Sequence, residues 1–133
     1  MLDCESRVKP PGLTSLRVLE TKWFAKAAAK ALITERMLCD AIAAVTKGQA
    51  DDLGGGVWKK RLGKNEYRSI ILAKSTHFWI YTFLFAKADR ANIDGKELAG
   101  FRKLAREFET LTDAKVDALM KSEGWREICN AKV

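Results

Sequence analysis

The chain has few of the residues on which conventional catalytic and metal sites depend. It contains one histidine, His77, and three widely spaced cysteines, Cys4, Cys39 and Cys129. A single histidine excludes the histidine pair of an acid–base ribonuclease, and no two cysteines have the spacing of zinc ligands. An odd number of scattered cysteines favours unpaired thiols in a reducing cytoplasm over a disulfide scaffold. We therefore expect no metal and no other cofactor.

Long apolar segments are missing as well. No run approaches the roughly 18 apolar residues of a membrane span, and residues 1–14 lack the apolar core of a secretory signal. We expect a cytoplasmic protein with no membrane partner, in which residues 1–14 form a flexible arm and residues 15–133 form one domain. Hydrophobic residues make up 47% of the 133, so this domain can bury a usable core.

The chain is rich in cations. Its net charge of +7 at pH 7 favours an acidic partner such as nucleic acid. The segment from Val57 to Arg68 contains five of the cations and only one anion, Glu66. The same segment has the pattern of a β-hairpin, so these charges are expected to lie on rigid backbone. A cation cluster that is held against its own repulsion favours a polyanionic partner such as RNA.

The first part of the domain predicts a short strand followed by a helical hairpin. Residues 16–20 alternate weakly between apolar and polar, which is typical of a strand. Two helices follow, joined near Ile33, with Thr34 as the cap of the second helix and Gly48 at its end. Their apolar stripes are Phe24, Ala27, Ala28, Ala31 and Leu32, and then Leu38, Ala41, Ile42 and Val45. A row of lysines on another face of the first helix, expected to be solvated, comprises Lys22, Lys26 and Lys30.

The middle of the chain predicts a sheet. Residues 49–56 form a turn-rich loop in which three consecutive glycines bend the chain. Strands are expected over residues 56–62, 66–74 and 77–87, and their short connections make antiparallel hairpins. The third strand is apolar on both faces, so we expect it to be central and its aromatic side chains to belong to the core.

The last part of the chain predicts two further helices and a candidate closing strand at residues 125–129. Asp94 and Glu97 have the spacing of a capping box, and Thr112 is placed to cap a shorter helix that ends at Gly124. The expected fold class is α+β: a small twisted antiparallel sheet with an N-terminal helical hairpin and C-terminal helices. We expect the helices to form a layer on one face of the sheet.

Strand periodicity predicts that cations gather at one end of this sheet. Lys59 and Arg61 are two residues apart and so share a face, and Arg68 returns opposite them on the next strand. Lys87 leaves the end of the third strand, and Arg90 follows it in the loop. The candidate catalytic residues are Lys59, Arg61, Arg68 and Lys87. The candidate RNA contacts are Lys60, whose parity is opposite to that of Lys59, together with Lys64 and Arg90.

Such a set of cations is suited to more than binding. When a 2′-hydroxyl of RNA attacks the neighbouring phosphate, negative charge builds up on the phosphate oxygens, and arginines stabilise it. A lysine crowded by other cations has a lowered pKa, so it can accept or return a proton near neutrality. Passive phosphate binding uses the same residues, and the sequence leaves both interpretations open.

A set of short motifs resembles one family along most of the chain, from about Thr21 to Ile128. The motifs occur in the order Leu53-Gly54-Gly55-Gly56, Lys59-Lys60-Arg61-Leu62, Tyr67-Arg68, Phe85-Ala86-Lys87, Asn92-Ile93, Glu97-Leu98, Ala105 and Glu127-Ile128. In order and spacing they resemble the RelE-type toxins of bacterial type II toxin–antitoxin systems, within the RelE/ParE superfamily.

This resemblance implies a microbial RNase-like fold and a toxin that cleaves mRNA on translating ribosomes. It implies a metal-independent endoribonuclease, an mRNA interferase, that uses the 2′-hydroxyl, inhibits translation and arrests growth. It also implies a cognate antitoxin, expected to have a helix-turn-helix, and it places the family's basic active-site residues at Lys59, Arg61, Arg68 and Lys87. Two alternatives stay open, since a fold does not fix a function: a ParE-like inhibitor of DNA gyrase, and a non-catalytic module that binds an antitoxin.

Overall fold

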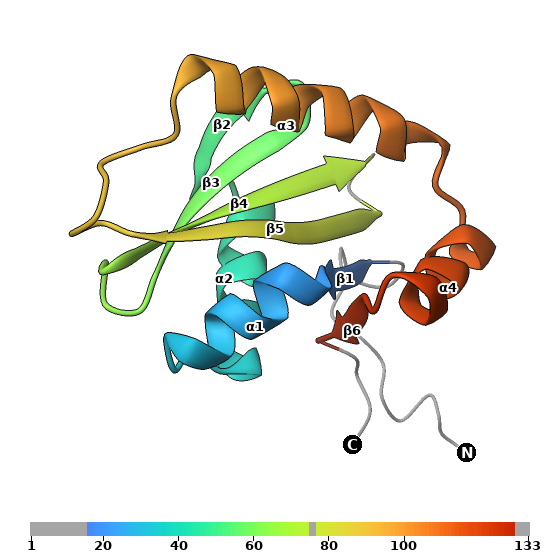
Figure 1. Cartoon of the computed structure of the whole chain (residues 1–133), viewed down its shortest axis with the longest axis horizontal. Coiled ribbons are helices and arrows are strands. Elements are labelled where there is room, and N and C mark those ends of the chain that lie inside the picture. The colour runs from blue at the N-terminus through green and yellow to red at the C-terminus, as the bar shows by residue number, and fades with distance from the viewer. Residues whose placement is uncertain (1–15, 75–76, 130–133) are drawn as a thin grey trace.

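The computed structural model describes residues 16–74 and 77–129, and the predicted arm at residues 1–14 lies outside them. Within these ranges, one six-stranded sheet has the strand order β2-β3-β4-β5-β1-β6, with helices on both faces (Figure 1). The fold is therefore α+β, as predicted. None of the described helices is long and apolar enough to cross a lipid bilayer. The strands are β1 (Arg17–Glu20), β2 (Asp51–Gly54), β3 (Val57–Leu62), β4 (Tyr67–Lys74), β5 (Phe78–Ala86) and β6 (Arg126–Ile128). The helices are α1 (Lys22–Lys30), α2 (Glu35–Thr46), α3 (Gly95–Glu107) and α4 (Asp113–Ser122), with a 3₁₀ turn at Phe108–Thr110.

The N-terminal helical hairpin begins each of its helices at a threonine cap. The Thr21 hydroxyl oxygen accepts a hydrogen bond from the backbone N–H of Phe24, and Thr34 caps α2 in the same way. The predicted apolar stripe of α2 is buried in full. The prediction for Leu32 is wrong. The α1 helix ends before it, its backbone adopts a φ of 60°, and its side chain is 84% exposed.

Three consecutive glycines turn the chain between β2 and β3. Gly54, Gly55 and Gly56 have φ angles of 85°, 66° and 84°, a region that glycine adopts without strain. The prediction of a loop over residues 49–56 is only partly correct, because residues 51–54 pair with β3 as an edge strand. The β5 strand lies between β4 and β1, so its predicted central position is confirmed.

The first strand covers only half of β5. β1 pairs in parallel with Phe78–Tyr81, and the chain then turns into α1. Among the described residues, no strand lies on that side of the remaining half of β5, residues 82–86, and α1 runs along it instead (Figure 1). The β5 strand therefore meets a helix, and not a strand, where it approaches the loop to α3.

Helices cover both faces of the sheet, which corrects the expectation of a layer on one face. The helices α1 and α2 pack on one face, where Phe24 contacts the core around Trp79 and Tyr81. The α3 helix packs on the other face, where Ala105 joins the cluster around Val57. The reason is that β4 and β5 carry apolar side chains of both parities, and neither face can be left in water.

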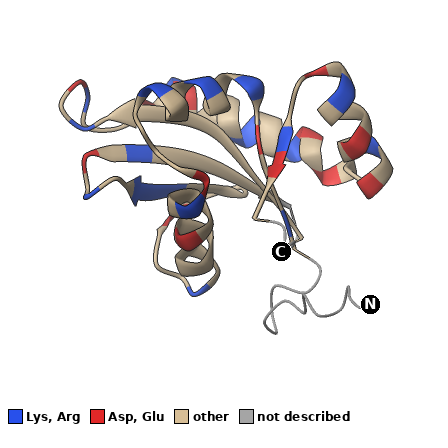
Figure 2. Ribbon diagram, turned by 90° about the horizontal axis from the view of Figure 1, so that it is seen from below, with Lys and Arg blue, Asp and Glu red and all other residues tan. Residues whose placement is uncertain are grey.

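A charge network joins the far edge of the sheet to α4. The Arg17 guanidinium on β1 donates to Glu127 on β6 and to Asp113 and Asp117 on α4, at 2.7–3.0 Å. These bonds lower the pKa of Asp113 and raise that of Arg17. His77 lies 3.6 Å from Asp113 at the same place. The acidic positions on α4 are visible in Figure 2. The network therefore fixes α4 against β1 and β6 at this edge of the sheet.

Cys39 and Cys129 form a disulfide, so the expectation of unpaired thiols is wrong for this pair. Cys39 belongs to α2 and Cys129 directly follows β6, and their Cα atoms are 5.3 Å apart although 90 residues separate them in the sequence. Scattered spacing did not reveal the pair, because only the packing of α2 beside the end of β6 brings the two thiols together. The third cysteine, Cys4, lies outside the described residues.

Candidate functional site

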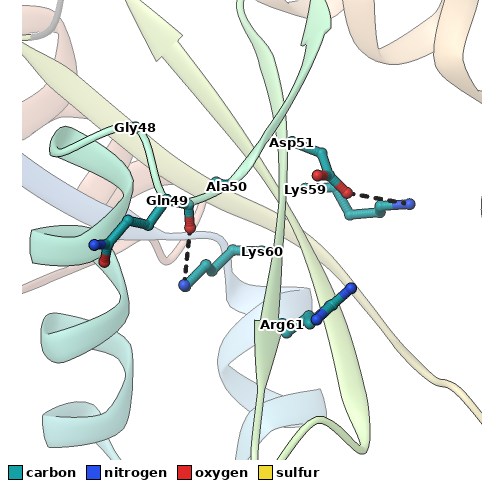
Figure 3. A pocket seen from close by; sticks show the side chains of 7 residues that line it. All are labelled: Gly48, Gln49, Ala50, Asp51, Lys59, Lys60 and Arg61. Atoms are coloured by element: carbon teal, nitrogen blue, oxygen red, sulfur yellow. Dashed lines mark hydrogen bonds and ion pairs between the residues drawn. The ribbon is translucent and has the colours of Figure 1, made fainter.

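The alternation of side chains along β3 separates its three consecutive cations. Lys59 and Arg61 extend from one side of the strand, and Lys60 extends from the other (Figure 3). Val57 has the parity of Lys59 and packs under α3, whereas Leu62 has the parity of Lys60 and packs with α1 and α2. Lys59 and Arg61 therefore lie on the α3 face of the sheet.

Two arginines stand directly opposite each other on β3 and β4. Arg61 is the register partner of Arg68, and the next pair of the same parity joins Lys59 to Ile70. On its other side, Arg68 is opposite Phe85 of β5. Neighbouring strands are about 4.8 Å apart, so Lys59, Arg61 and Arg68 form one group, here called the cation patch. Like charges directly opposite each other destabilise a sheet, so this pairing has a cost in the absence of a counter-ion.

Backbone carbonyls of the hairpin turn hold Arg68 in place. Its NH1 atom donates to the carbonyl oxygens of Asn65 at 3.0 Å and Tyr67 at 3.2 Å, and the residue is only 9% exposed. Asn65 and its neighbour Lys64 both have positive φ, which is typical of a tight hairpin turn. The turn therefore orients the buried arginine of the pair, while Arg61 remains exposed to solvent.

The loop after β5 positions Lys59. The Lys59 Nζ atom donates to Asn92 Oδ1 at 3.2 Å, and the same oxygen accepts a hydrogen bond from the Ile93 N–H at 2.9 Å. The Asp51 carboxylate lies 3.7 Å from Lys59 Nζ, but its side chain is largely exposed, so solvent screens this ion pair. The Lys59 side chain is 15% exposed and its tip is held by Asn92. It therefore loses little further conformational entropy when its charge contacts a ligand.

Lys87 reaches the same end of the sheet from β5. Its backbone N–H donates to the carbonyl of Glu66 at 2.8 Å, which continues the pairing of β4 and β5 to the hairpin turn. The Lys87 side chain is exposed, and with Lys64 and Tyr67 it lines a cavity of about 540 Å³. Figure 2 shows several Lys and Arg positions at this end of the molecule.

Arg90 lies close to the cation patch, but its charge is already balanced. Its guanidinium is paired with Glu97 at the start of α3 and lies 5.5 Å from the centre of the Phe85 ring. The bond to Arg90 lowers the pKa of Glu97, and the same bond raises the pKa of Arg90. Glu97 also accepts a hydrogen bond from the Asp94 N–H in the predicted capping box. Arg90 therefore fixes the loop to the helix.

Lys60 lies apart from the other candidates. Its Nζ atom donates to the backbone carbonyl of Gln49 at 2.9 Å, on the α2 side of the sheet. The cavity in Figure 3, about 370 Å³, includes residues from both sides of β3 and so is not a single binding site. The opposite parity of Lys60 was predicted, and the Gln49 carbonyl is its local hydrogen-bond partner.

Comparison with known proteins decides the family. A family model described as "RelE toxin of RelE / RelB toxin-antitoxin system" matches residues 16–128. The chain belongs to the RelE toxin family. The match spans every strand and helix described above, and it confirms the resemblance drawn from the motifs. The chain is thus the toxin of a toxin–antitoxin pair, and an antitoxin is its partner. No curated protein and no solved structure gives a significant match.

In this RelE toxin, the predicted site residues fall into three groups. The first group is the cation patch, which contains three of the candidate catalytic residues, together with Lys87 and Lys64 at the same end of the sheet. The second is Arg90, whose charge is balanced by Glu97 nearby. The third is Lys60, which lies on the other face of the sheet. Sequence reasoning missed Asn92 as the partner of Lys59, because a loop contact 33 residues away has no local signal. Within the described ranges, no group of three or more His, Cys, Asp or Glu side chains could hold a metal ion.

Proposed function

We propose that this RelE-family toxin is a cytoplasmic, ribosome-dependent mRNA endoribonuclease that inhibits translation and so arrests growth. The observation that supports the activity is the arginine pair, Arg61 and Arg68, directly opposite each other on rigid strands. Their repulsion is relieved when an anion lies between them, and guanidinium groups bind phosphate oxygens through paired hydrogen bonds. The antitoxin is proposed to be a helix-turn-helix DNA-binding protein, as is expected for a RelE partner.

The proposed reaction is an internal transfer that uses the RNA's own nucleophile. The 2′-oxygen attacks the adjacent phosphorus, the bond from phosphorus to the 5′-oxygen breaks, and the products are a 2′,3′-cyclic phosphate and a 5′-hydroxyl. One proton leaves the 2′-hydroxyl and one is delivered to the 5′-oxygen. Arg61 and Arg68 stabilise the charge that develops on the phosphate oxygens. Lys59 and Lys87 lie on either side of the arginine pair along the strands, and in this proposal they exchange these protons.

The test is to map the 5′ ends of mRNA after induction in cells. We expect codon-phased cuts with the natural protein and their loss in Arg61→Ala/Arg68→Ala. Arg36→Ala/Lys115→Ala removes the same number of charges from exposed positions on α2 and α4, and should leave the cuts intact. Because Arg68 is buried, Arg61→Ala alone serves where the double variant is unfolded, as judged by its thermal melt.

Other outcomes separate the alternatives. DNA damage without mRNA cuts would replace the ribonuclease with a gyrase inhibitor. Neither effect, with no arrest of growth, would leave a module that only binds an antitoxin. Cuts that persist in both arginine variants would remove the cation patch from the mechanism.

A further inference from the structure

Trp23 is the most exposed of the four tryptophans. Its side chain lies at the start of α1 and is 52% exposed, whereas Trp79 and Trp125 are buried and Trp58 is half-buried. The core does not require it, because the adjacent Phe24 supplies the buried aromatic ring of α1. The indole is nevertheless held in a definite place, stacked on Phe83 with 5.2 Å between the ring centres and 25° between the planes.

A row of aromatic rings leads from Trp23 to the cation patch. Phe83 lies 6.0 Å from Phe85, measured between ring centres, and Phe85 is the register partner of Arg68. Phe83 also contacts Phe101 of α3 at 5.9 Å, so both phenylalanines lie on the α3 face, as the cation patch does. The exposed indole is therefore two aromatic steps from the proposed site of the scissile phosphate.

The surroundings of Trp23 combine an aromatic surface with cations. A groove of about 440 Å³ runs between α1 and the edge of β5 that lies beyond its pairing with β1, and Trp23, Lys30, Phe85 and Arg90 are among its lining residues. Lys26 and Lys30, from the predicted lysine row, lie three and seven residues after Trp23 and so share its side of the helix. One carboxylate, Asp89, also lines the groove, and the Arg90 charge is balanced by Glu97. Lys30 therefore gives the groove a positive rim, and the exposed Lys26 extends the positive charge along the same side of α1.

We propose that Trp23 is a base-stacking residue for single-stranded RNA. A base beside the scissile phosphate stacks on the indole, and the backbone phosphates of that strand pass along Lys26 and Lys30. Aromatic rings beside a positive groove bind single strands in this way, and every base offers a π-face, so Trp23 contributes affinity and position without reading sequence. The inference rests on the proposed function, because it extends the path of the same RNA strand. The positive rim favours RNA over an extended peptide, the other occupant that an open strand edge admits.

The test measures binding of a fluorescein-labelled 2′-O-methyl RNA oligomer by anisotropy, since this RNA has no 2′-hydroxyl to react. Trp23→Ala should weaken binding about 5- to 150-fold. Trp23→Phe should bind within about twofold of the natural protein, because it keeps a ring. Leu32→Ala, which truncates the other large apolar side chain that is exposed within residues 16–74 and 77–129, is the matched control and should leave RNA binding unchanged.

Salt dependence separates this inference from the proposed function. Trp23→Ala should keep the slope of log Kd against log salt, whereas Arg61→Ala should reduce it by about 0.7, the value for one phosphate contact on a single strand. RNA should also protect the natural protein from acrylamide quenching of tryptophan fluorescence, and that protection should be absent in Trp23→Phe. This second readout applies even where Trp23→Ala is unfolded.

The contrary outcomes are distinct. Natural affinity in Trp23→Ala, together with weakened binding in Arg61→Ala, would overturn the stacking role and leave the ribonuclease proposal standing. Loss of antitoxin binding with unchanged RNA binding in Trp23→Ala would assign the groove to a protein partner and overturn the inference. No binding of the oligomer by the natural protein at low salt would overturn the stacking inference, whereas the map of mRNA 5′ ends decides the ribosome-dependent ribonuclease proposal on its own.

Discussion

Removing one member of the arginine pair should make the protein more stable while abolishing its activity. Arg61→Thr leaves Arg68 with its carbonyl partners and replaces the exposed arginine with a residue that favours strands. Directly opposed like charges cost about 0.2–1 kcal/mol. Since Arg61 is exposed and screened, we expect a gain near the middle of that range, about 0.5 kcal/mol. For a chain of this length that gain corresponds to a rise in Tm of about 2 °C.

The assay is a thermal melt in 20 mM and 500 mM sodium chloride, without phosphate or sulfate. The advantage of Arg61→Thr should be largest at low salt and should shrink at high salt, where the Debye length falls to a few ångströms. Added polyphosphate should raise the Tm of the natural protein more than that of the variant, because the variant has one fewer group to bind it.

A matched substitution on the other face gives the control. Lys60→Thr introduces the same residue at the next position of β3, but it removes the hydrogen bond to the Gln49 carbonyl and no opposed arginine. We expect it to lower the Tm slightly. A melt of Arg61→Thr below that of the natural protein at low salt would refute the claim that the pair is strained without an anion.

Three other substitutions or treatments test features outside the cation patch. Arg17 holds the pKa of Asp113 below its ordinary value of 3.8, so this contact stabilises the fold above that pH and is lost as the pH falls through the lower folded pKa. Asp113→Asn should therefore melt earlier than the natural protein at pH 7, and the difference should shrink as the pH is lowered below 3.8; equal melts at pH 7 would contradict this. Burial raises the pKa of Glu20 above 4.5, so its charge costs stability at neutral pH and not below pH 4. Glu20→Gln should raise the Tm at pH 7 by more than at pH 4, and a loss of Tm that is larger at pH 7 than at pH 4 would show that the ion pair with Arg126 outweighs burial. Reduction of the bond between Cys39 and Cys129, which closes a 90-residue segment, should lower the free energy of unfolding by about 4 kcal/mol. Urea midpoints with and without reductant measure this, and Cys39→Ser should be indifferent to reductant.

Features that depend on neighbouring residues were predictable from the sequence. Thr34, Asp94 and Thr112 cap helices as expected, because a cap needs only a side chain within one turn of the backbone that it binds. The hairpin strands were found within a residue or two for the same reason. The strand at residues 51–54, the parallel pairing of β1 with β5 and the second helical layer were not found. Each of these features depends on which segment, distant in the sequence, packs against the strand or the sheet.

The candidate site shows the same division. A period of two was enough to separate Lys60 from Lys59 and Arg61 and to place Arg68 opposite them. The pairing of Arg90 with Glu97 was missed, although Glu97 was identified as a capping residue, because its second hydrogen-bonding role depends on the path of the loop. Trp23 was not singled out either. The sequence indicated only that Trp23 lies outside the apolar stripe of α1. Its stacking on Phe83, which shows that the exposed ring is held in place, is visible only in the structure.

The disulfide between α2 and the end of β6 closes a loop of the chain that contains the whole candidate site. All seven predicted site residues, from Lys59 to Arg90, lie inside the segment bounded by Cys39 and Cys129. A protease that cut the backbone once in the hairpin turn or in the loop before α3 would therefore release no fragment. The disulfide would keep the two pieces in one molecule until a reductant cleaved it. The strands of the cut toxin could therefore stay paired in the sheet.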